Sequence, residues 1–180
     1  MIETSMPVRE KPQQFKSSLH EKSYAGLDQL GIDFERVSCE EAVTIDQCQA
    51  IATVLRAPVV KTLFVANRQL TRFHLVVLPG SKPFVTKDFS KSRGVSRVSF
   101  VSPELMMSML STPVGGASPL SILADEAGIV ELDVDAEVMD LPEVVCPAAT
   151  PCDYVRLKTS DLFNRLLPLL SGRHPVVVSL

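Results

Sequence analysis

The pattern of hydrophobic and polar positions divides the chain into helical and extended segments separated by turn-forming residues. Apolar residues at helical spacing predict helices over residues 15–30, 44–55, 86–92, 102–110 and 159–170. Alternating or continuous apolar runs predict strands over 32–37, 59–66, 72–78, 95–100, 128–134, 143–146, 153–157 and 175–180. Because strands and helices mix without strict alternation, we expect an α/β (α+β) fold whose mixed, mostly antiparallel sheet is flanked by helices.

Residues suited to helix ends and turns support these boundaries. Gly31 fits the position after the first helix. Thr44 and Ser102 fit N-cap positions, and Pro103 fits the first turn of the helix after Ser102. Residues 67–69, "NRQ", supply a short polar turn, so the strands on either side of it are expected to form an antiparallel hairpin.

Length and segment composition indicate one domain. The 180 residues are enough for one domain with a well-buried core and too few for two domains that each bury a sizeable core. We expect residues 1–14 to be a polar lead-in and residues 15–180 to be the domain. No apolar run approaches the roughly 20 residues of a membrane span, and the N-terminal segment lacks the apolar core of a signal peptide. These patterns predict a cytoplasmic protein without a membrane partner.

The four cysteines, Cys39, Cys48, Cys146 and Cys152, do not follow a CxxC metal or redox spacing. Without a secretion signal, reduced thiols are expected. The segment between Cys146 and Cys152 contains no Lys, Arg or His to lower a thiol pKa. Both are therefore expected to be packing residues rather than reactive thiols.

Charge is unevenly distributed, although the net charge is only −3. Residues 56–97 contain nine Lys and Arg residues and one acid, Asp88, whereas residues 98–155 contain ten acids and no Lys or Arg. Folding of these segments leads either to one positive face or to interleaved charges that cancel.

Lys61 interrupts a strand that is otherwise apolar on both faces. Val59, Leu63 and Val65 share its face, and the opposite face is also largely apolar. Such a strand is expected to be central and covered on both sides. Burying an unpaired ammonium there is costly. The pattern leaves three arrangements open: the lysine reaches the strand edge, pairs with a buried acid, or faces a cavity that receives an anionic ligand.

The loop Gly115–Pro119, "GGASP", is a second candidate for a binding role. Two glycines permit a positive φ or a close approach of backbone to a ligand, and Pro119 biases Ser118 toward an extended conformation. Successive free N–H groups in such a loop can bind a carbonyl oxygen or an oxyanion. The alternative is a tight connection without a ligand.

The histidines do not suggest a catalytic base. His20, His74 and His174 are scattered, and no Ser-His-Asp or Cys-His arrangement is visible. His74 lies in the expected hairpin, where an isolated histidine is more often a core or surface residue than a base.

Taken in order, five stretches resemble the YbaK/ProX family of trans-editing aminoacyl-tRNA deacylases, which is related to the editing domain of bacterial prolyl-tRNA synthetases. They are "VVKTLFV", "FHLVVLPG", "SRVSFVSPELM", "GGASPLSILAD" and "SDLFNRLLPLLSGRHPVVVSL". The resemblance covers roughly Leu27 to Leu180. It implies the family's editing-domain fold and hydrolysis of the ester between a wrong amino acid and the terminal adenosine of a tRNA, with no metal or other cofactor.

The resemblance also implies roles for individual residues. Lys61, Gly115 and Ser118 are the expected catalytic positions, with Lys61 contacting the terminal nucleotide and the glycine loop positioning the aminoacyl group. The expected substrate-binding positions are Thr44, Thr62, Gly116, Ala117, Pro119 and Asp125. In the family, a hydroxyl of the terminal ribose is implied to help activate the water. An ester is already activated, so positioning and oxyanion donors can supply much of the catalysis.

Two departures from the family pattern leave the amino acid open. Thr62 stands where the alanyl-tRNA branch usually has Asn, and this resembles the cysteinyl-tRNA branch instead. Residues 146–154, "CPAATPCDY", replace a His-Pro…Asn-Thr segment of the alanyl branch, while the closing "VVVSL" resembles that branch. The expected substrate is therefore Ala- or Cys-tRNA(Pro), with tRNA(Pro) and prolyl-tRNA synthetase as partners.

Two other functions remain open at this stage. The first is an inactive module of the same fold that binds tRNA or a synthetase. The second is a hydrolase of small aminoacyl esters or thioesters that does not use RNA.

Overall fold

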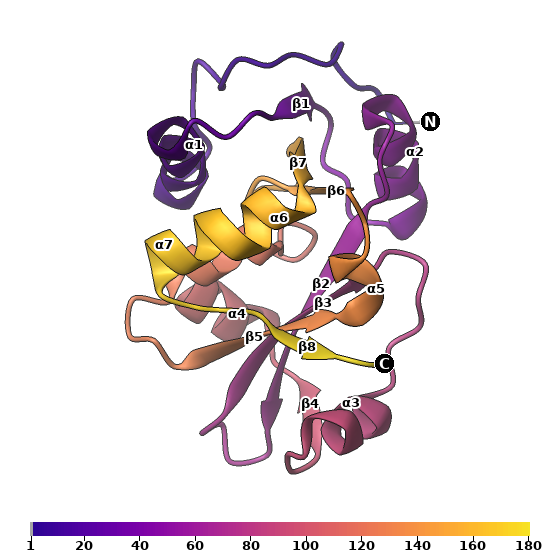
Figure 1. Cartoon of the computed structure of the whole chain (residues 1–180), viewed down its shortest axis with the longest axis vertical. Helices are drawn as coiled ribbons and strands as arrows, with labels where there is room; N and C mark the ends of the chain where they lie inside the picture. The colour runs from indigo at the N-terminus through magenta and orange to yellow at the C-terminus, as the bar shows by residue number, and fades with distance from the viewer. Residues whose placement is uncertain (1) are drawn as a thin grey trace.

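A five-stranded sheet forms the larger part of the framework of the computed structural model, which describes residues 2–180. Its strand order is β4-β2-β3-β5-β8 (Figure 1). The strands are β4 (Val98–Phe100), β2 (Val60–Asn67), β3 (Phe73–Pro79), β5 (Val130–Asp135) and β8 (Val176–Val178). Strand β2 is antiparallel to both β3 and β4, whereas β5 is parallel to β3 and to β8.

A smaller antiparallel sheet has the order β1-β7-β6. Its strands are β1 (Glu35–Ser38), β7 (Asp153–Lys158) and β6 (Glu143–Pro147). The two sheets meet where Val59 forms a bridge with Val145, whose N–H donates to the Pro58 carbonyl at 2.8 Å. Four of the six strand pairings within residues 2–180 are antiparallel, which confirms the mixed, mostly antiparallel fold predicted from the sequence.

Helices cover both sheets, and all five predicted helices are present. They are α1 (Ser18–Leu30), α2 (Ile45–Leu55), α3 (Thr86–Arg93), α4 (Pro103–Leu110) and a C-terminal segment made of α6 (Thr159–Asp161), η2 (Leu162–Leu166) and α7 (Leu167–Ser171). The sequence pattern did not predict two short helices, η1 (Pro119–Ala124) and α5 (Ala136–Met139).

Three elements begin three residues later than predicted, for local reasons. Helix α1 begins at Ser18 rather than residue 15 because the Ser17 hydroxyl accepts from the His20 N–H at 3.1 Å and caps the helix. Strand β1 begins at Glu35 rather than Ile32 because the Ile32 N–H still closes the end of α1.

Strand β4 begins at Val98 rather than Val95 for the same kind of reason. Gly94 ends α3 in the left-handed conformation, and the Val95 N–H donates to the Ser90 carbonyl at 3.0 Å. Residues 94 and 95 therefore belong to the helix cap and not to the strand.

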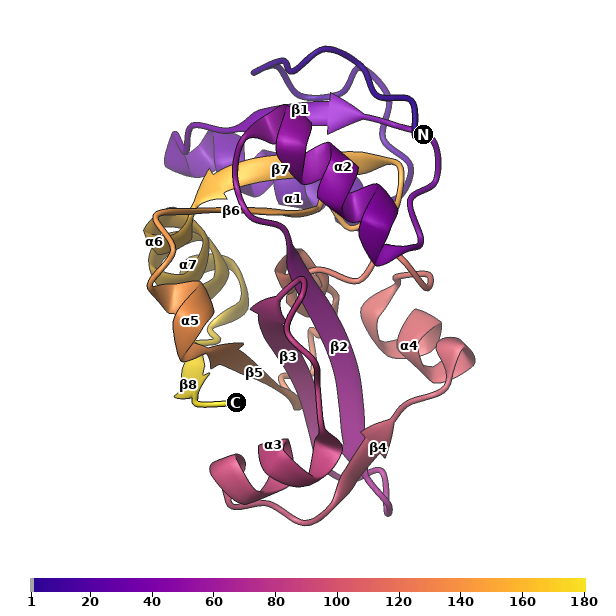
Figure 2. The ribbon, with the colours of Figure 1, turned by 90° about the vertical axis from the view of Figure 1, so that its right-hand side faces the viewer.

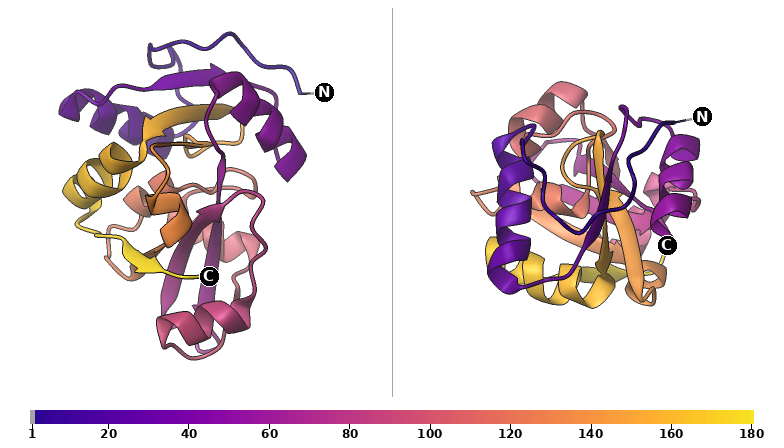
Figure 3. Two further views of the ribbon diagram at one scale, coloured as in Figure 1. Left: turned by 45° about the vertical axis from the view of Figure 1, so that its right-hand side comes forward. Right: turned by 90° about the horizontal axis from the view of Figure 1, so that it is seen from above.

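The small sheet lies between α1 and α2, which flank it on opposite sides (Figures 1 and 3). Val155 and Leu157 of β7 pack into the main core, which also contains Leu27 of α1. Tyr154, on the other face of β7, packs with Leu55 and its neighbours on α2. The alternation of side chains along β7 thus serves two different cores.

Strand β2 is central, as predicted. Val60 and Phe64 belong to the main core on one face, while Val65 packs with Phe89 of α3 on the other. The start of β2 therefore lies at the junction of the two sheets, beneath α2 (Figure 2).

Within residues 2–180, no helix has both the length and the apolar character needed to cross a bilayer.

Candidate active site

A cavity of about 150 Å³ opens at the start of β2. Four segments contribute to it: the entrance to α2, the first residues of β2, the glycine loop and the β6–β7 connection. The lining residues are Ala42, Val43, Thr44, Ile45, Cys48, Val59, Val60, Lys61, Thr62, Gly115, Ala117, Pro147 and Tyr154. Five of the nine residues predicted for the site, Thr44, Lys61, Thr62, Gly115 and Ala117, thus lie around one cavity.

Thr44 caps the N-terminus of α2 beside the cavity. Its hydroxyl accepts from the Gln47 N–H at 3.3 Å, while the Gln47 side chain accepts from the Thr44 N–H at 3.0 Å. This capping box satisfies two backbone donors at the helix start. It holds the first turn of α2, including Ile45 and Cys48, beside the start of β2.

Lys61 reaches the cavity without an acidic partner in the described part of the chain. Its ammonium donates to the Lys82 carbonyl oxygen in the loop after β3. Burial lowers the pKa of Lys61 below the ordinary value of 10.5. Of the three arrangements left open by the sequence, the structure therefore places Lys61 in the one that faces a cavity.

Thr62 offers a polar group that the rest of the described chain leaves unpaired. Its side chain is 9% exposed, and its Oγ1 atom is buried without a hydrogen bond within residues 2–180. Buried hydroxyl groups are usually hydrogen-bonded, and leaving one unpaired costs about 1–3 kcal/mol. Thr62 is among the residues that line the cavity, and its Oγ1 atom is buried behind that lining.

Gly115 brings the glycine loop into contact with the opposite cavity wall. Its φ is +85°, and a Cβ atom there would lie 2.9 Å from Val43 Cγ1 and 3.2 Å from the Ala42 oxygen. Both the conformation and the close approach require glycine. Gly116 packs against Pro151, and its N–H donates to the Pro113 carbonyl at 3.0 Å, which closes the turn.

Two amides of this loop lack an acceptor in the described chain. Within residues 2–180, the N–H groups of Gly115 and Ala117 make no hydrogen bond to the protein, although both residues line the cavity. The loop can therefore direct backbone donors at a ligand oxygen, which is the arrangement of an oxyanion site.

Ser118, Pro119 and Asp125 are not part of the cavity lining. Ser118 is fully buried, and its hydroxyl accepts from the Leu120 N–H at 3.1 Å as the cap of η1. Asp125 ends η1, forms an ion pair with Arg173 at 2.6 Å and accepts from the Val130 N–H at 2.8 Å. The Ser118 cap fixes the junction of the loop with η1, and the assignment of all three residues to catalysis or binding stays a prediction.

Eight of the lining residues were not predicted from the sequence, and two of these, Cys48 and Tyr154, bring a thiol and a phenol to the cavity. The Cys48 thiol lies 3.2 Å from the Tyr154 hydroxyl, which also donates to the Ala42 carbonyl at 3.4 Å. Burial raises the pKa of Tyr154, so the phenol remains protonated. Only the pairing of β7 with its neighbours brings residue 154 near residues 42 and 48, and no local sequence pattern carries that information.

The same cavity lies within a region that matches a known family. The model of the aminoacyl-tRNA editing domain matches residues 39–164, well over half of the chain. This chain belongs to the aminoacyl-tRNA editing domain family. All the cavity residues fall inside the matched region.

Comparison with individual proteins agrees with this assignment. The editing domain is 26% identical over 129 residues to the Prolyl-tRNA editing protein ProX of Acetoanaerobium sticklandii, an alignment that covers 72% of this chain and 77% of that protein. These findings confirm the resemblance to the YbaK/ProX family.

Solved structures confirm the fold. A crystal structure of a candidate trans-editing enzyme for prolyl-tRNA synthetase superimposes with a TM-score of 0.67 at 15% identity, covering 91% of this chain and 98% of that chain. The crystal structure of a hypothetical protein gives a TM-score of 0.67 at 19% identity, covering 87% and 98%.

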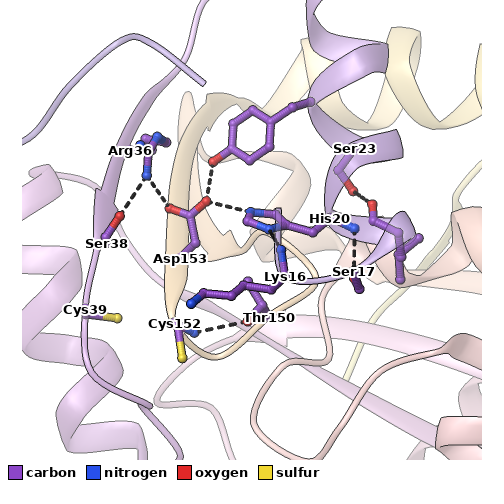
Figure 4. Close-up of polar contacts among 12 residues, drawn as sticks. Lys16, Ser17, His20, Ser23, Arg36, Ser38, Cys39, Thr150, Cys152 and Asp153 are labelled. Carbon is purple, nitrogen blue, oxygen red and sulfur yellow. Dashed lines mark hydrogen bonds and ion pairs between the residues drawn. The ribbon is translucent and has the colours of Figure 1, made fainter. Parts of the chain in front are cut away.

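A buried polar network centred on Asp153 anchors β7 (Figure 4). Asp153 accepts from Tyr24 at 2.7 Å and from Arg36 at 3.1 Å, and it lies 2.8 Å from Nε2 of His20. Nδ1 of His20 accepts from the Lys16 N–H at 3.1 Å, so Nε2 is the nitrogen that donates to Asp153. The network connects α1 and β1 to the strand whose next residue lines the cavity.

His74 is a core residue, one of the two locations that the sequence left open for it. It is fully buried, with Nδ1 2.8 Å from Asp133, and Asp133 also accepts from Arg93 at 2.6 Å. Arg93 and Arg72 both pair with Glu131. We refer to these five residues as the Asp133 network.

The cysteines occupy different environments, and all four are free thiols in the structure. Cys146 is fully buried in the main core, and burial raises its pKa to about 12, in agreement with a packing role. Cys152 is partly exposed and lines, with Cys39, a second cavity of about 330 Å³ beside His20.

The charged segments interleave only in part. Arg72, Lys82 and Arg93 pair with acids of residues 131–137, because the parallel pairing of β5 with β3 brings those acids alongside. Within residues 2–180, the remaining basic side chains of residues 56–97 form no ion pair. They are Arg56, Lys61, Arg68, Lys87, Lys91 and Arg97. Interleaving with acids therefore holds for three of the nine basic side chains, and a single positive face formed by the others stays a prediction.

Proposed function

We propose that this editing domain is an aminoacyl-tRNA deacylase that hydrolyses mischarged tRNA(Pro), with Ala- or Cys-tRNA(Pro) as its substrate. The observation that carries the proposal is one small cavity bordered by Lys61, Thr62 and the free amides of Gly115 and Ala117. The family assignment supports the reaction class. Similarity to a prolyl-tRNA editing protein, and to the fold of a candidate trans-editing enzyme for prolyl-tRNA synthetase, supports the prolyl-tRNA system.

The groups around the cavity suit ester hydrolysis. Water adds to the ester carbonyl carbon, the carbonyl oxygen gains negative charge, and the bond to the ribose oxygen then breaks to release the amino acid and tRNA. In this proposal the amides of Gly115 and Ala117, which have no acceptor within the described chain, donate to that oxygen. Lys61 supplies a positive charge for the anionic terminal nucleotide, and a ribose hydroxyl of the substrate assists the attacking water.

The size of the cavity supports a small aminoacyl group. Its volume is about 150 Å³, and Val43, Ile45, Cys48 and Val59 supply much of its wall. A small pocket rejects a larger cognate side chain and accepts a smaller one, which is the principle of a second sieve. Among small amino acids, Ala and Cys are the two to compare. Thr62 differs from the residue usual in the alanyl branch, whereas the closing segment resembles that branch.

Contact with the rest of the tRNA is assigned to the basic segment 56–97, several of whose cations are not neutralised within the described chain. Such contact predicts that affinity falls as salt rises, because phosphate contacts release counterions. An affinity independent of salt would remove this role from the segment. Prolyl-tRNA synthetase is the proposed protein partner.

The test is single-turnover deacylation of alanyl-, cysteinyl- and seryl-tRNA(Pro) by the wild type and by Lys61→Ala. We expect fast hydrolysis of alanyl- or cysteinyl-tRNA(Pro) and a loss of at least about 100-fold in the variant. Lys16→Ala is the matched control, because it removes an exposed lysine outside the cavity and should leave the rate unchanged.

Two results would replace the proposal. Tight binding of charged tRNA without turnover would favour a binding module, whose motivation is the replaced segment 146–154. Equal rates on a free aminoacyl ester and on charged tRNA would favour a small-ester hydrolase.

A further inference from the structure

A hollow of about 530 Å³ lies at the opposite end of β2 from the Lys61 cavity. It is bordered by the β2–β3 turn and by β4, the edge strand of the large sheet. Along strand β2, Lys61 and Asn67 are six residue steps apart, or about 20 Å at ~3.3 Å per residue. Figure 2 shows this strand extending from beneath α2 to the turn beside β4 and α3.

Two arginines give the hollow an uncompensated positive charge. Arg68 and Arg97 are both exposed, and neither forms an ion pair with any residue between 2 and 180. The neighbouring Arg72 and Arg93 differ, because Glu131 pairs with both of them. Among the described residues, no acid lines the hollow, so its charge is complementary to an anion.

Exposed apolar groups lie beside these arginines. Phe100 is 59% exposed on β4, and Leu70 is 52% exposed at the turn, where its φ of +53° is unusual for leucine. Asn67 holds the turn by accepting from the N–H groups of Thr71 and Arg72 at 2.9 and 3.0 Å. Phe100 borders the same hollow as the two arginines, and its ring also packs edge-on against Phe84, with ring centroids 5.9 Å apart.

This combination favours RNA over an acidic protein segment. Arginine pairs with phosphate through its planar set of donors, and aromatic side chains pack on bases and sugars independently of sequence. An acidic peptide would neutralise Arg68 and Arg97 but would not require an exposed aromatic ring beside them.

We propose that this surface, which we call the hairpin-tip patch (Arg68, Leu70, Arg97 and Phe100), binds a second stretch of the RNA whose 3′ end enters the Lys61 cavity. Arg68 and Arg97 contact phosphates, and Phe100 packs against a base or sugar. The proposal rests on the proposed function for the identity of the RNA. Because both sites lie on β2, one rigid strand sets the spacing between them.

Binding of uncharged tRNA(Pro), followed by fluorescence anisotropy across a range of salt concentrations, tests the patch without any reaction. For Arg68→Ala/Arg97→Ala we expect at least a ~10-fold loss of affinity and a salt slope reduced by about 1.4–1.8, at roughly 0.7–0.9 per phosphate contact. Phe100→Ala should weaken binding with the slope unchanged.

The matched control is Arg9→Ala/Lys16→Ala, which removes the same charge from exposed positions in the N-terminal segment. Its affinity should change less than ~2-fold, because a phosphate contact and not net charge carries the effect. An equal loss in both double variants would overturn the patch, and so would unchanged affinity in Arg68→Ala/Arg97→Ala.

Deacylation kinetics of the patch variant test the hairpin-tip patch independently of the proposed function. The patch variant should raise KM for aminoacyl-tRNA, with kcat retained and hydrolysis of an aminoacyl-adenosine ester unchanged. Equal slowing of both substrates would overturn the proposal, because the substitutions would then act through the cavity. If the wild type hydrolyses neither substrate, the proposed function fails, and the anisotropy measurement still decides the patch.

Discussion

The β2–β3 hairpin contains two polar clusters that differ in whether their charged groups are paired within the fold. At one end, Lys61 and Thr62 face a cavity, with the Thr62 hydroxyl unpartnered and Lys61 without an acid in the described chain. Further along β3, His74 is buried against Asp133, which Arg93 also contacts. A charged group that the fold itself satisfies contributes to structure. Within residues 2–180, Nε2 of His74 is also buried without a partner, so it is the ion pairing of the charged groups that distinguishes the two clusters: Asp133 is paired with Arg93, whereas Lys61 has no acid.

Gly115→Ala should have the largest effect on the cavity side. The new Cβ would lie 2.9 Å from Val43 Cγ1 and 3.2 Å from the Ala42 oxygen, so the loop must move and its amides lose their position. We expect deacylation to fall by about 100-fold or more, the loss typical of removing an oxyanion donor. Single-turnover kinetics and thermal melting would measure it.

Gly94→Ala is the control for backbone strain. Gly94 also has a positive φ, of +66°, but a Cβ there meets nothing within 4 Å. We expect a stability loss of about 1 kcal/mol and normal deacylation. If both glycine variants lose activity equally, strain and not the cavity contact explains the effect.

Asp133→Asn should have the largest effect on the structural side. It removes the charge that pairs with Arg93 and His74 in a fully buried position. Breaking a buried pair typically costs about 3–5 kcal/mol, so we expect the free energy of unfolding in urea to fall by about 3 kcal/mol. Deacylation per folded molecule should remain. Loss of activity at full stability would contradict the separation of the two clusters.

Thr62→Val tests the same comparison in the Lys61–Thr62 cluster. The substitution removes a buried hydroxyl that has no partner within residues 2–180 and keeps the side-chain shape. We expect stability to stay constant or rise by about 1 kcal/mol, while deacylation falls about 10-fold. Urea unfolding and single-turnover rates on one preparation would show whether the two quantities move in opposite directions. A stability loss of the size expected for Asp133→Asn would mean that Thr62 is structural.

The smallest expected effect is a pH dependence of stability caused by Lys61. Burial lowers its folded-state pKa below 10.5, so between the folded and unfolded values the unfolded chain binds more protons. Stability therefore rises with pH in this alkaline window and is lost as pH falls through the folded pKa. The difference in unfolding free energy between the wild type and Lys61→Met should accordingly shift toward the wild type as pH approaches 10.5. A difference that is flat with pH would contradict burial of the ammonium.

The sequence predicted the elements that depend on neighbouring residues. The hairpin with Lys61, the capped start of α2 and the glycine turn each follow from side chains a few positions apart. Thr44 and Ser102 occupy their predicted caps because their hydroxyls accept from backbone N–H groups three residues later.

The sequence did not predict features that depend on pairing between distant segments. Tyr154 reaches Cys48 across 106 positions, and Asp153 reaches His20 across 133. Likewise, the acids of β5 neutralise Arg72 and Arg93 only because β5 lies parallel to β3. These contacts depend on strand order, which local hydrophobic patterns do not encode.

The bridge between Val59 and Val145 has a thermodynamic consequence. It joins the two sheets at the point where residues from both of them line the cavity. A molecule bound there contacts Lys61 from one sheet and Tyr154 from the other, so its binding energy also holds the sheets together. Occupancy of the cavity should therefore slow hydrogen exchange at the Val145 amide, far along the chain from Lys61, and the junction would report substrate binding as a change in local opening.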